Sequence, residues 1–472
     1  MSKHALILSA ILFPVTVGGQ QESSWATLTD ETRAAMEAHA SAYKTFMKET
    51  KTELHFVREA VRLAREAGFS ELTDGSRLSP GARFYDVNRD RTLTLIVVGQ
   101  RPVKEGFQVV GAHIDSPRLE LKARPLYEKE GFALFQTNYH GGIKTYQWTN
   151  LPLALMGRVD LKNGRTVWIS VGNEEDQPTF LIADLSPHVD AQLRERRARE
   201  AIELEELDPI VGHVPASGAG GVKQAVVEYL RKTYEIELDD LVSAELALVP
   251  ALAPRDVGFD QGLMAIYGQD DRLSGYAALR AILDSPDPDL TAIAYLVDNE
   301  EVGNVNNTGA DSTYLVDLMG RLLYEEMGEA FREHWLRRAL RSTRVLSSDV
   351  NPGINPMWPD AWEEGNAPRL GQGVNLKMYG RGFNANSEYT AWIRKVLDDA
   401  HVPWQVATYK VGRAGGGTIG RALADDNMEV IDLGVPVLSI HTPYSVSSKL
   451  DVYSLYRAMH AFFMAARPSS PS

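Results

Sequence analysis

A short apolar run that ends in acidic residues is the feature that most constrains the fold of this chain. Residues Thr291 to Val297 are mostly apolar, which is typical of a strand buried in a parallel sheet. The sequence DNEE follows at once and places Glu300 and Glu301 where that strand ends. Ligands of open α/β sheets bind at the carboxyl ends of strands, so two carboxylates here indicate a site. One could bind a metal ion while the other acts as a general base, and a plain acidic turn is the alternative for this pair alone.

The composition limits the partners and the chemistry of such a site. The chain has 472 residues, which is too long for one ordinary core and predicts two domains. Its net charge of −14 argues against nucleic acid and anionic membranes as partners. Cysteine is absent, which excludes thiol catalysis, disulfides and cysteine-based zinc sites. Any metal ion must therefore be held by His, Asp and Glu.

The character of the sequence changes twice along the chain, which predicts a discontinuous catalytic domain. Residues 25–116 and 259–468 alternate strand-like apolar runs with helical patterns, as in an α/β domain. Residues 117–258 instead contain short β-like runs separated by Gly, Asn and Pro turns, which predicts a β-rich inserted domain. The elements expected on these patterns include strands at 92–99 and 106–122 and helices at 30–68, 192–206, 222–234 and 312–342.

The first 19 residues resemble a secretory signal peptide. A short start with Lys3 and His4 precedes an apolar run of about a dozen residues, which Pro14 interrupts before a small-residue exit. The run is too short to span a bilayer as a permanent helix. We therefore expect a periplasmic or secreted protein. A cytoplasmic protein with a misassigned start is the alternative.

Further histidines and acids follow apolar runs elsewhere in the α/β region. His113 and Asp115 come at the end of one strand and lie on the same face, because strand side chains alternate. Each acid has an ordinary alternative, such as a helix cap for an acid at a helix entry, but together they form a set of candidate ligands. The candidate metal ligands are His113, Asp271, Glu301, Asp349 and His441.

This ligand set suits two divalent ions and leaves two carboxylates for chemistry. Five ligands with one shared carboxylate fit a pair of ions roughly 3.5–4 Å apart. Donors that are only nitrogen and oxygen favour zinc, with cobalt or manganese as possible substitutes. Asp115 and Glu300 remain for catalysis.

The motifs around these residues resemble those of the M18 family of metallo-aminopeptidases, most closely its bacterial aminopeptidase 1 branch. GAHIDSPRLELK, YGQDDRLSGY, VDNEEVGN, SSDVNPGINP and LSIHTPYSVSSKLD occur in the family's order. The resemblance implies a zinc-peptidase-type α/β/α catalytic domain with an inserted β-rich dimerisation domain. It also implies an enzyme that removes N-terminal residues from short peptides with two zinc ions per subunit.

The resemblance also implies a role for each candidate residue. His113, Asp271 and Asp349 would bind one ion, while Asp271, Glu301 and His441 would bind the other, so that Asp271 is shared. Asp115 would orient His113 and Glu300 would be the general base. The family's substrate-binding elements correspond here to Lys377, Gly416, Gly417 and Thr418.

Several features concern the assembly and the differences from relatives. Asn299 and Asn304 stand where relatives usually carry a basic residue and a serine. The resemblance implies dimers assembling into a hollow dodecamer, with the region from Asp184 to His188 in place of a histidine that a neighbouring subunit donates in the family's eukaryotic branch. Because the insert leaves and rejoins the chain beside the site, its His140-Gly141-Gly142 loop can lie close to it.

Two other functions remain as alternatives. The sequence GGGTIG at 415–420 fits the glycine pattern of an NAD-dependent dehydrogenase, although Asp432 follows too soon to be the usual ribose ligand. A non-catalytic scaffold with the same fold would be expected to lose a ligand or the base, and none is missing.

Overall fold

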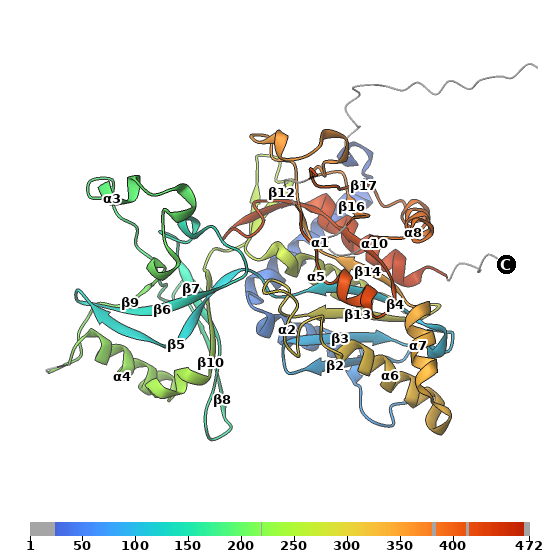
Figure 1. The fold of residues 1–472 in the computed structure, drawn as a ribbon, viewed down its shortest axis with the longest axis horizontal. Coiled ribbons are helices and arrows are strands. Elements are labelled where there is room, and N and C mark those ends of the chain that lie inside the picture. The colour runs from blue at the N-terminus through green and yellow to red at the C-terminus, as the bar shows by residue number, and fades with distance from the viewer. Residues whose placement is uncertain (1–23, 219, 380–383, 412–414, 467–472) are drawn as a thin grey trace, which may run out of the picture.

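A nine-stranded sheet forms the framework of the larger half of the molecule (Figure 1). The computed structural model describes residues 24–218, 220–379, 384–411 and 415–466. The predicted signal peptide at 1–19 lies outside these ranges. Within them, no helix is both long and apolar enough to cross a membrane.

The centre of this sheet is parallel and fully buried. The strand order is β1-β2-β3-β13-β4-β14-β18-β16-β17. Strand β4 pairs in parallel with β13 on one side and with β14 on the other, and every residue of β4 and β13 is buried. The strands are β1 (Ser70–Glu71), β2 (Arg83–Asn88), β3 (Thr92–Val97), β4 (Phe107–His113), β13 (Thr291–Val297), β14 (Arg344–Ser348), β16 (Val374–Lys377), β17 (Trp404–Val406) and β18 (Glu429–Gly434).

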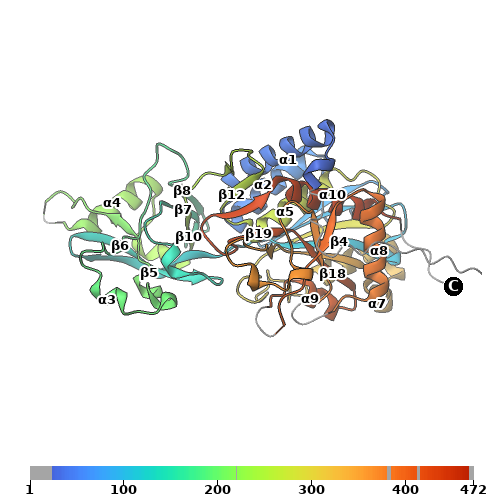
Figure 2. The same cartoon turned by 90° about the horizontal axis from the view of Figure 1, so that it is seen from above.

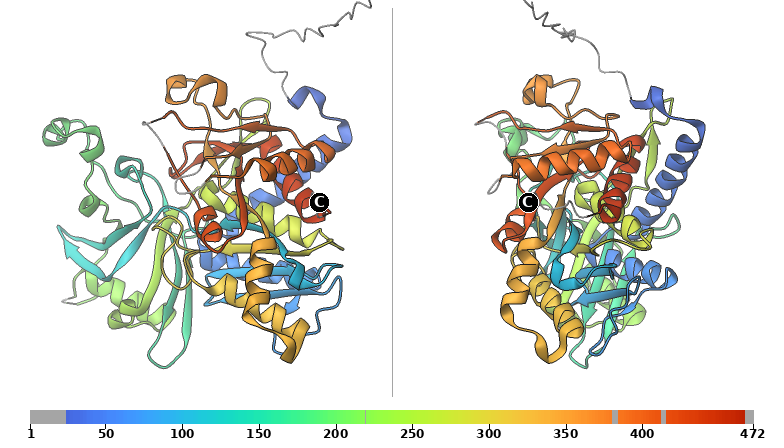
Figure 3. Two further views of the ribbon diagram at one scale, coloured as in Figure 1. Left: turned by 45° about the vertical axis from the view of Figure 1, so that its right-hand side comes forward. Right: turned by 90° about the vertical axis from the view of Figure 1, so that its right-hand side faces the viewer.

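Helices cover both faces of the nine-stranded sheet, so the expected α/β/α architecture is confirmed. One apolar core joins the sheet to α1 (Asp30–Glu49), α2 (Glu53–Glu66), α5 (Gln269–Leu283), α8 (Ser387–Asp399) and α10 (Lys449–Met464). A second core joins the opposite face to α6 (Tyr314–Met327), α7 (Glu333–Ser342) and α9 (Gly420–Asp425). In Figure 3, α6 and α7 (gold) accordingly lie apart from α1 (blue) and α10 (red).

A second, six-stranded sheet lies beside this α/β unit (Figures 1 and 2). Its strands all fall between Arg118 and Pro250, and it has its own apolar core with α4 (Val222–Tyr234). The order is β8-β7-β10-β5-β6-β9. These strands are β5 (Arg118–Lys129), β6 (Phe132–His140), β7 (Leu153–Asp160), β8 (Thr166–Val171), β9 (Ile210–Gly212) and β10 (Ala244–Pro250).

A third sheet consists of five short strands. Its order is β11-β12-β20-β19-β15, and β12 and β19 both pair with β20. The loop that carries His441 lies between β19 and β20, next to the strand that leads into α5. The strands are β11 (Arg255–Val257), β12 (Leu263–Ile266), β15 (Asn351–Pro352), β19 (Pro436–Leu438) and β20 (Ser445–Ser448).

Four predicted elements differ from the structure, two of them for a reason visible at the break. The helix expected at 30–68 is two helices, because Thr52 caps a new start at α2. The helix expected at 312–342 breaks at Gly328, whose φ of 54° ends α6. The strand expected at 106–122 is two strands of different sheets, β4 and β5. The charged stretch at 192–206 forms only the four-residue helix α3 (Ala191–Arg194) and short 3-10 turns.

Candidate metal centre

The first candidate residues lie at the carboxyl ends of three neighbouring parallel strands. His113 is the last residue of β4, Glu300 and Glu301 follow β13, and Asp349 follows β14. The side chains converge: Nε2 of His113 lies 3.8 Å from a carboxylate oxygen of Glu300 and 3.8 Å from one of Asp349. The ends of these strands thus bring the three side chains close together.

Asp270 joins two groups of potential ligands. Its Oδ1 lies 3.2 Å from Nε2 of His113, and its Oδ2 lies 3.0 Å from Nε2 of His441. Nε2 of His441 is also 3.4 Å from Glu301. Two sets of three residues therefore have their ligand atoms within 4.8 Å of one another, and Asp270 belongs to both. The sets are His113, Asp270 and Asp349, and Asp270, Glu301 and His441.

The shared carboxylate differs from the one expected, because Asp271 belongs to neither group. Neither acid has helical backbone angles: Asp270 is extended (φ −92°, ψ 106°) and Asp271 has φ −120° and ψ 30°, so regular helix begins only after both. The carboxylate of Asp270 is the one that faces the two histidines. Asp271 is fully buried, and neither of its carboxylate oxygens has a hydrogen-bond partner among the described residues.

The buried atoms at this site fit cations. Among the residues that the structure describes, one oxygen each of Glu301 and Asp349 and Nε2 of His113 are buried without a hydrogen-bond partner. Burial by itself lowers the pKa of His441, but the carboxylates of Asp270 and Glu301 raise it to about 10. Burial and repulsion from Asp270 raise the pKa of Glu301 well above its ordinary value. The cluster thus favours added positive charge, as expected of a site for divalent ions.

Both histidines present Nε2 to the cluster because Nδ1 is engaged elsewhere. Nδ1 of His441 lies 2.7 Å from the carbonyl oxygen of Gly142, which can only accept, so Nδ1 carries the proton. Nδ1 of His113 lies 3.1 Å from the carboxylate of Asp115. Such partners fix the tautomer and orientation of a metal-binding imidazole.

The carboxylate of Asp115 accepts hydrogen bonds from several groups at the centre of the site. The backbone N–H groups of Glu300 and Glu301 both donate to its carboxylate at 3.1 Å. Nε2 of His140 lies 2.8 Å from its second oxygen. Burial would raise the pKa of Asp115, but the hydrogen bonds from His113 and His140 hold it far below its ordinary value. Asp115 therefore remains charged, and it touches His113 and the Glu300–Glu301 turn together.

Glu300 is placed beside the ligand groups without belonging to either. It lies 3.8 Å from Nε2 of His113, with its side chain largely buried. Burial raises its pKa to about 8; His113 opposes this shift, while Asp349 and Asp270 add to it. A carboxylate whose pKa lies near neutrality can both accept and return a proton.

The inserted domain reaches into the site with three consecutive residues. His140 contacts Asp115, the carbonyl of Gly142 accepts from His441, and Gly141 lies against Glu301. A Cβ at Gly141, whose φ is +73°, would lie 2.8 Å from Oε2 of Glu301. The proximity expected from the insertion point is therefore present. The role of His140 could not be found from the sequence, because no spacing relates it to Asp115.

Two of the predicted substrate-binding residues, Lys377 and Gly416, lie beside Tyr409. Nζ of Lys377 is 5.3 Å from the ring centre of Tyr409, and the charge of Lys377 acts on Asp349. A Cβ at Gly416 would lie 3.3 Å from the hydroxyl of Tyr409, which places this loop beside the same tyrosine. Gly417 is half-buried and Thr418 is buried. Tyr409 was not expected from the sequence.

Two further expectations concern the surface and the turn after β13. Asn299 and Asn304 have φ values of 62° and 60°, the left-handed region that Asn tolerates better than most residues. Their presence is thus explained by the backbone of the turn. The stretch from Asp184 to His188 is exposed on the inserted domain.

Comparison with known proteins places this chain in a family. The family model described as "Aminopeptidase I zinc metalloprotease (M18)" matches residues 46–463. A protein from Borrelia garinii named "Probable M18 family aminopeptidase 1" is 36% identical over 94% of this chain and 99% of its own length.

Solved structures agree with this match. The M18 aminopeptidase of Thermotoga maritima is 37% identical with a TM-score of 0.89, and covers 94% of this chain and 99% of its own. Aminopeptidase I of Clostridium acetobutylicum is 34% identical with a TM-score of 0.86, and covers 95% of this chain and 100% of its own. The mature yeast enzyme, solved as a dodecamer, is 21% identical with a TM-score of 0.75, covers 91% of this chain and 97% of its own, and shares the fold.

Proposed function

The chain belongs to the M18 family of zinc metallo-aminopeptidases, and from this premise we propose that it removes N-terminal residues from short peptides with two zinc ions per subunit. Family membership favours the peptidase over the dehydrogenase and the non-catalytic scaffold. The observation that carries the proposal is the pair of three-residue groups that share Asp270.

The two groups assign the residues that would hold the ions. We assign His113, Asp270 and Asp349 to one ion, and Asp270, Glu301 and His441 to the other. One histidine in each group supports this assignment, because zinc accepts imidazole nitrogen together with carboxylate oxygen. Asp270 has one oxygen facing each histidine, which suits a carboxylate shared between two ions.

The remaining groups perform the proton transfers. Two zinc ions at these positions would polarise the scissile carbonyl and acidify a water molecule. Glu300 removes the proton of the attacking water and returns it to the nitrogen of the leaving amine. Asp115 holds the ring of His113 and the backbone of the Glu300–Glu301 turn, so it acts by positioning them.

The wall beside Asp349 is proposed to receive the substrate's N-terminal residue. The support is that Lys377 and Gly416 both lie beside Tyr409, and that Gly417 and Thr418 follow in the same loop. A cation and an aromatic ring at one wall support polar as well as apolar side chains as substrates. The preferred residue follows from the assay below.

We further propose that the subunits assemble through the inserted domain into a dodecamer. The support is the yeast relative, which was solved in that state, together with the β-rich insert. The exposed stretch from Asp184 to His188 is then available to a neighbouring subunit. An enclosed assembly would admit short peptides and exclude folded proteins. Light scattering that finds an active monomer would contradict this proposal.

Export is proposed separately, on the pattern of residues 1–19. The mature protein would begin near Gln20 in the periplasm or outside the cell. N-terminal sequencing of the native protein tests this, and an intact Met1 in the cytoplasmic fraction would refute it.

The enzymatic proposal is tested with a panel of aminoacyl p-nitroanilides. Enzyme stripped of metal is assayed after zinc, cobalt or manganese is added back, with N-acetylated substrates as the matched control. We expect activity only on free amino termini, full restoration at two ions per subunit, and a clear order among the aminoacyl groups. Equal cleavage of the acetylated substrates, or restoration at one ion per subunit, would contradict the proposed mechanism.

A further inference from the structure

His140 occupies an unusual place for a residue of the inserted domain. It is the last residue of β6 and is 6% exposed. Nε2 lies 2.8 Å from Oδ2 of Asp115, and Nδ1 lies 3.2 Å from a carboxylate oxygen of Glu120. An imidazole between two carboxylates can donate to both, so its ring is held in one orientation.

The contact of His140 with Asp115 helps to fix a carboxylate that positions other groups of the metal centre. Oδ1 of Asp115 serves Nδ1 of His113 and the N–H of Glu300, whereas Oδ2 serves His140 and the N–H of Glu301. Without His140, Oδ2 would keep only the backbone donor. The carboxylate would then be held by three hydrogen bonds instead of four, so its plane would be less firmly fixed, and it positions the imidazole of His113 and the turn with the proposed general base.

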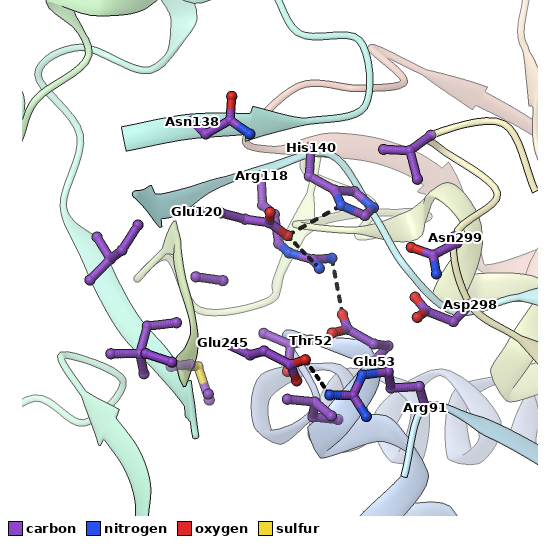
Figure 4. A pocket seen from close by; sticks show the side chains of 18 of the residues that line it. Thr52, Glu53, Arg91, Arg118, Glu120, Asn138, His140, Glu245, Asp298 and Asn299 are labelled. Atoms are coloured by element: carbon purple, nitrogen blue, oxygen red, sulfur yellow. Dashed lines mark hydrogen bonds and ion pairs between the residues drawn. The ribbon is translucent and has the colours of Figure 1, made fainter. Parts of the chain in front are cut away.

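The second contact anchors His140 to both halves of the molecule. Glu120 is bound by Arg118 at 2.8 Å, and Arg118 also binds Glu53 of α2 at 3.0 Å. Figure 4 shows this chain of ion pairs from His140 through Glu120 and Arg118 to Glu53. The imidazole is thus placed by the inserted sheet and by a helix of the catalytic domain together.

We propose that His140 is a positioning residue of the metal centre, through which the inserted domain holds Asp115 and thereby orients His113 and the Glu300–Glu301 turn. This inference rests on the proposed dinuclear aminopeptidase. It gives the inserted domain a part in catalysis that is separate from assembly. A purely structural role, in which the ion pairs only join the two domains, makes different predictions.

A cavity beside His140 makes a chemical test possible. It has a volume of about 380 Å³ and is lined by His140, Glu120 and Arg118 among others (Figure 4). Removal of the imidazole in His140→Gly would open a further space next to this cavity. Added imidazole can then enter and occupy the place of the missing ring.

The experiment compares wild type, His140→Gly and His140→Gln. We measure kcat and KM with the best p-nitroanilide, zinc affinity by competition with a chromophoric chelator, and Tm. Loss of a partner that orients a metal-binding histidine typically weakens metal binding or activity by about 10–100-fold. We expect such a loss in kcat and in zinc affinity for His140→Gly, with KM changed less than kcat. The glutamine variant, which keeps one donor, should recover part of both.

Imidazole distinguishes positioning from a structural role. Millimolar imidazole should raise kcat of His140→Gly several-fold, whereas wild type in the same titration shows only inhibition. The matched control is His213→Gly, since His213 is a histidine of the same domain whose Nδ1 contacts the carbonyl of Gly131. This control should match wild type throughout.

Several results would overturn the proposal. Wild-type kcat and zinc affinity in His140→Gly would do so, as would a fall in Tm alone without rescue by imidazole. If His140→Gly does not fold, the same measurements are made on His140→Ala and His140→Gln. Wild-type kcat and zinc affinity in His140→Ala would then refute the proposal. So would values for His140→Gln that are no higher than those for His140→Ala. A wild-type enzyme that binds no zinc or cleaves no peptide would instead refute the proposed function, so the two failures are distinguishable.

Discussion

Single substitutions of Asp270 and Asp271 test the assignment of the shared carboxylate most directly. Asp270 has one oxygen 3.2 Å from Nε2 of His113 and the other 3.0 Å from Nε2 of His441. An amide has only one oxygen acceptor, so Asp270→Asn cannot serve both positions and also loses its negative charge. Asp271→Asn changes a buried group that belongs to neither set of ligands.

The size of the effect follows from the number of ligands. Zinc binding to structural sites is worth about 10–16 kcal/mol over four ligands, or about 3 kcal/mol for each ligand. A loss of that size raises Kd by about two orders of magnitude. Asp270→Asn should therefore weaken one ion by about 100-fold and the other by a similar or smaller factor. Asp271→Asn should change either affinity less than threefold.

The assay is zinc content by elemental analysis after dialysis against a series of zinc buffers. Wild type and Asp271→Asn should hold two ions at free zinc concentrations where Asp270→Asn holds fewer than one. Asp349→Ala and His441→Ala, each from one group, should retain about one ion. The reasoning is refuted if Asp271→Asn loses zinc while Asp270→Asn keeps both ions.

Three other predictions concern the base, the inserted loop and a buried histidine. Glu300→Gln should keep both ions while kcat falls by about two to four orders of magnitude; near-normal turnover would exclude it as the base. Gly141→Ala should lower kcat and zinc content by displacing Glu301, which lies 2.8 Å from the added Cβ, and an unchanged enzyme would contradict this contact. Burial, aided by Arg280, lowers the pKa of His39 to about 4, so its neutral form favours folding. Stability is therefore lost as pH falls below 6.5, by about 2 kcal/mol at pH 5. In urea unfolding, His39→Phe should lose less stability between pH 7 and 5 than wild type, and equal losses would refute the assignment.

The place of the candidate site could be predicted from the sequence because the boundaries of its main strands are visible in the pattern of apolar residues. Thr291 to Val297 is apolar throughout and forms β13 with those limits, and its acids emerge beside His113 since β4 and β13 are parallel neighbours. The pattern of apolar residues predicts a strand and its end, and parallel pairing then places the ends together.

The choice between Asp270 and Asp271 could not be made from the pattern. Both acids lie at the entry to a helix and both have non-helical backbone angles, so only the folded arrangement shows that the oxygens of Asp270 face His113 and His441. Periodicity is defined inside an element and is lost at its first residue.

The contribution of His140 could not be predicted from the sequence either. Its partner Asp115 precedes it by 25 positions and belongs to another domain, so only the folded arrangement brings them together. The same limit applies to Tyr409, which reaches the wall of the site from a loop after β17.

The spread of the site along the chain has a consequence for how the enzyme becomes active during synthesis. Gly142 and His441 are 299 positions apart, and His441 precedes only the last strand and helix. Contacts of such sequence separation close late, because a long loop must be ordered before they stabilise anything. A nascent chain therefore cannot place His441 in the site until almost all of the chain has left the ribosome. If His441 binds the second ion as proposed, peptide hydrolysis would begin only in finished subunits.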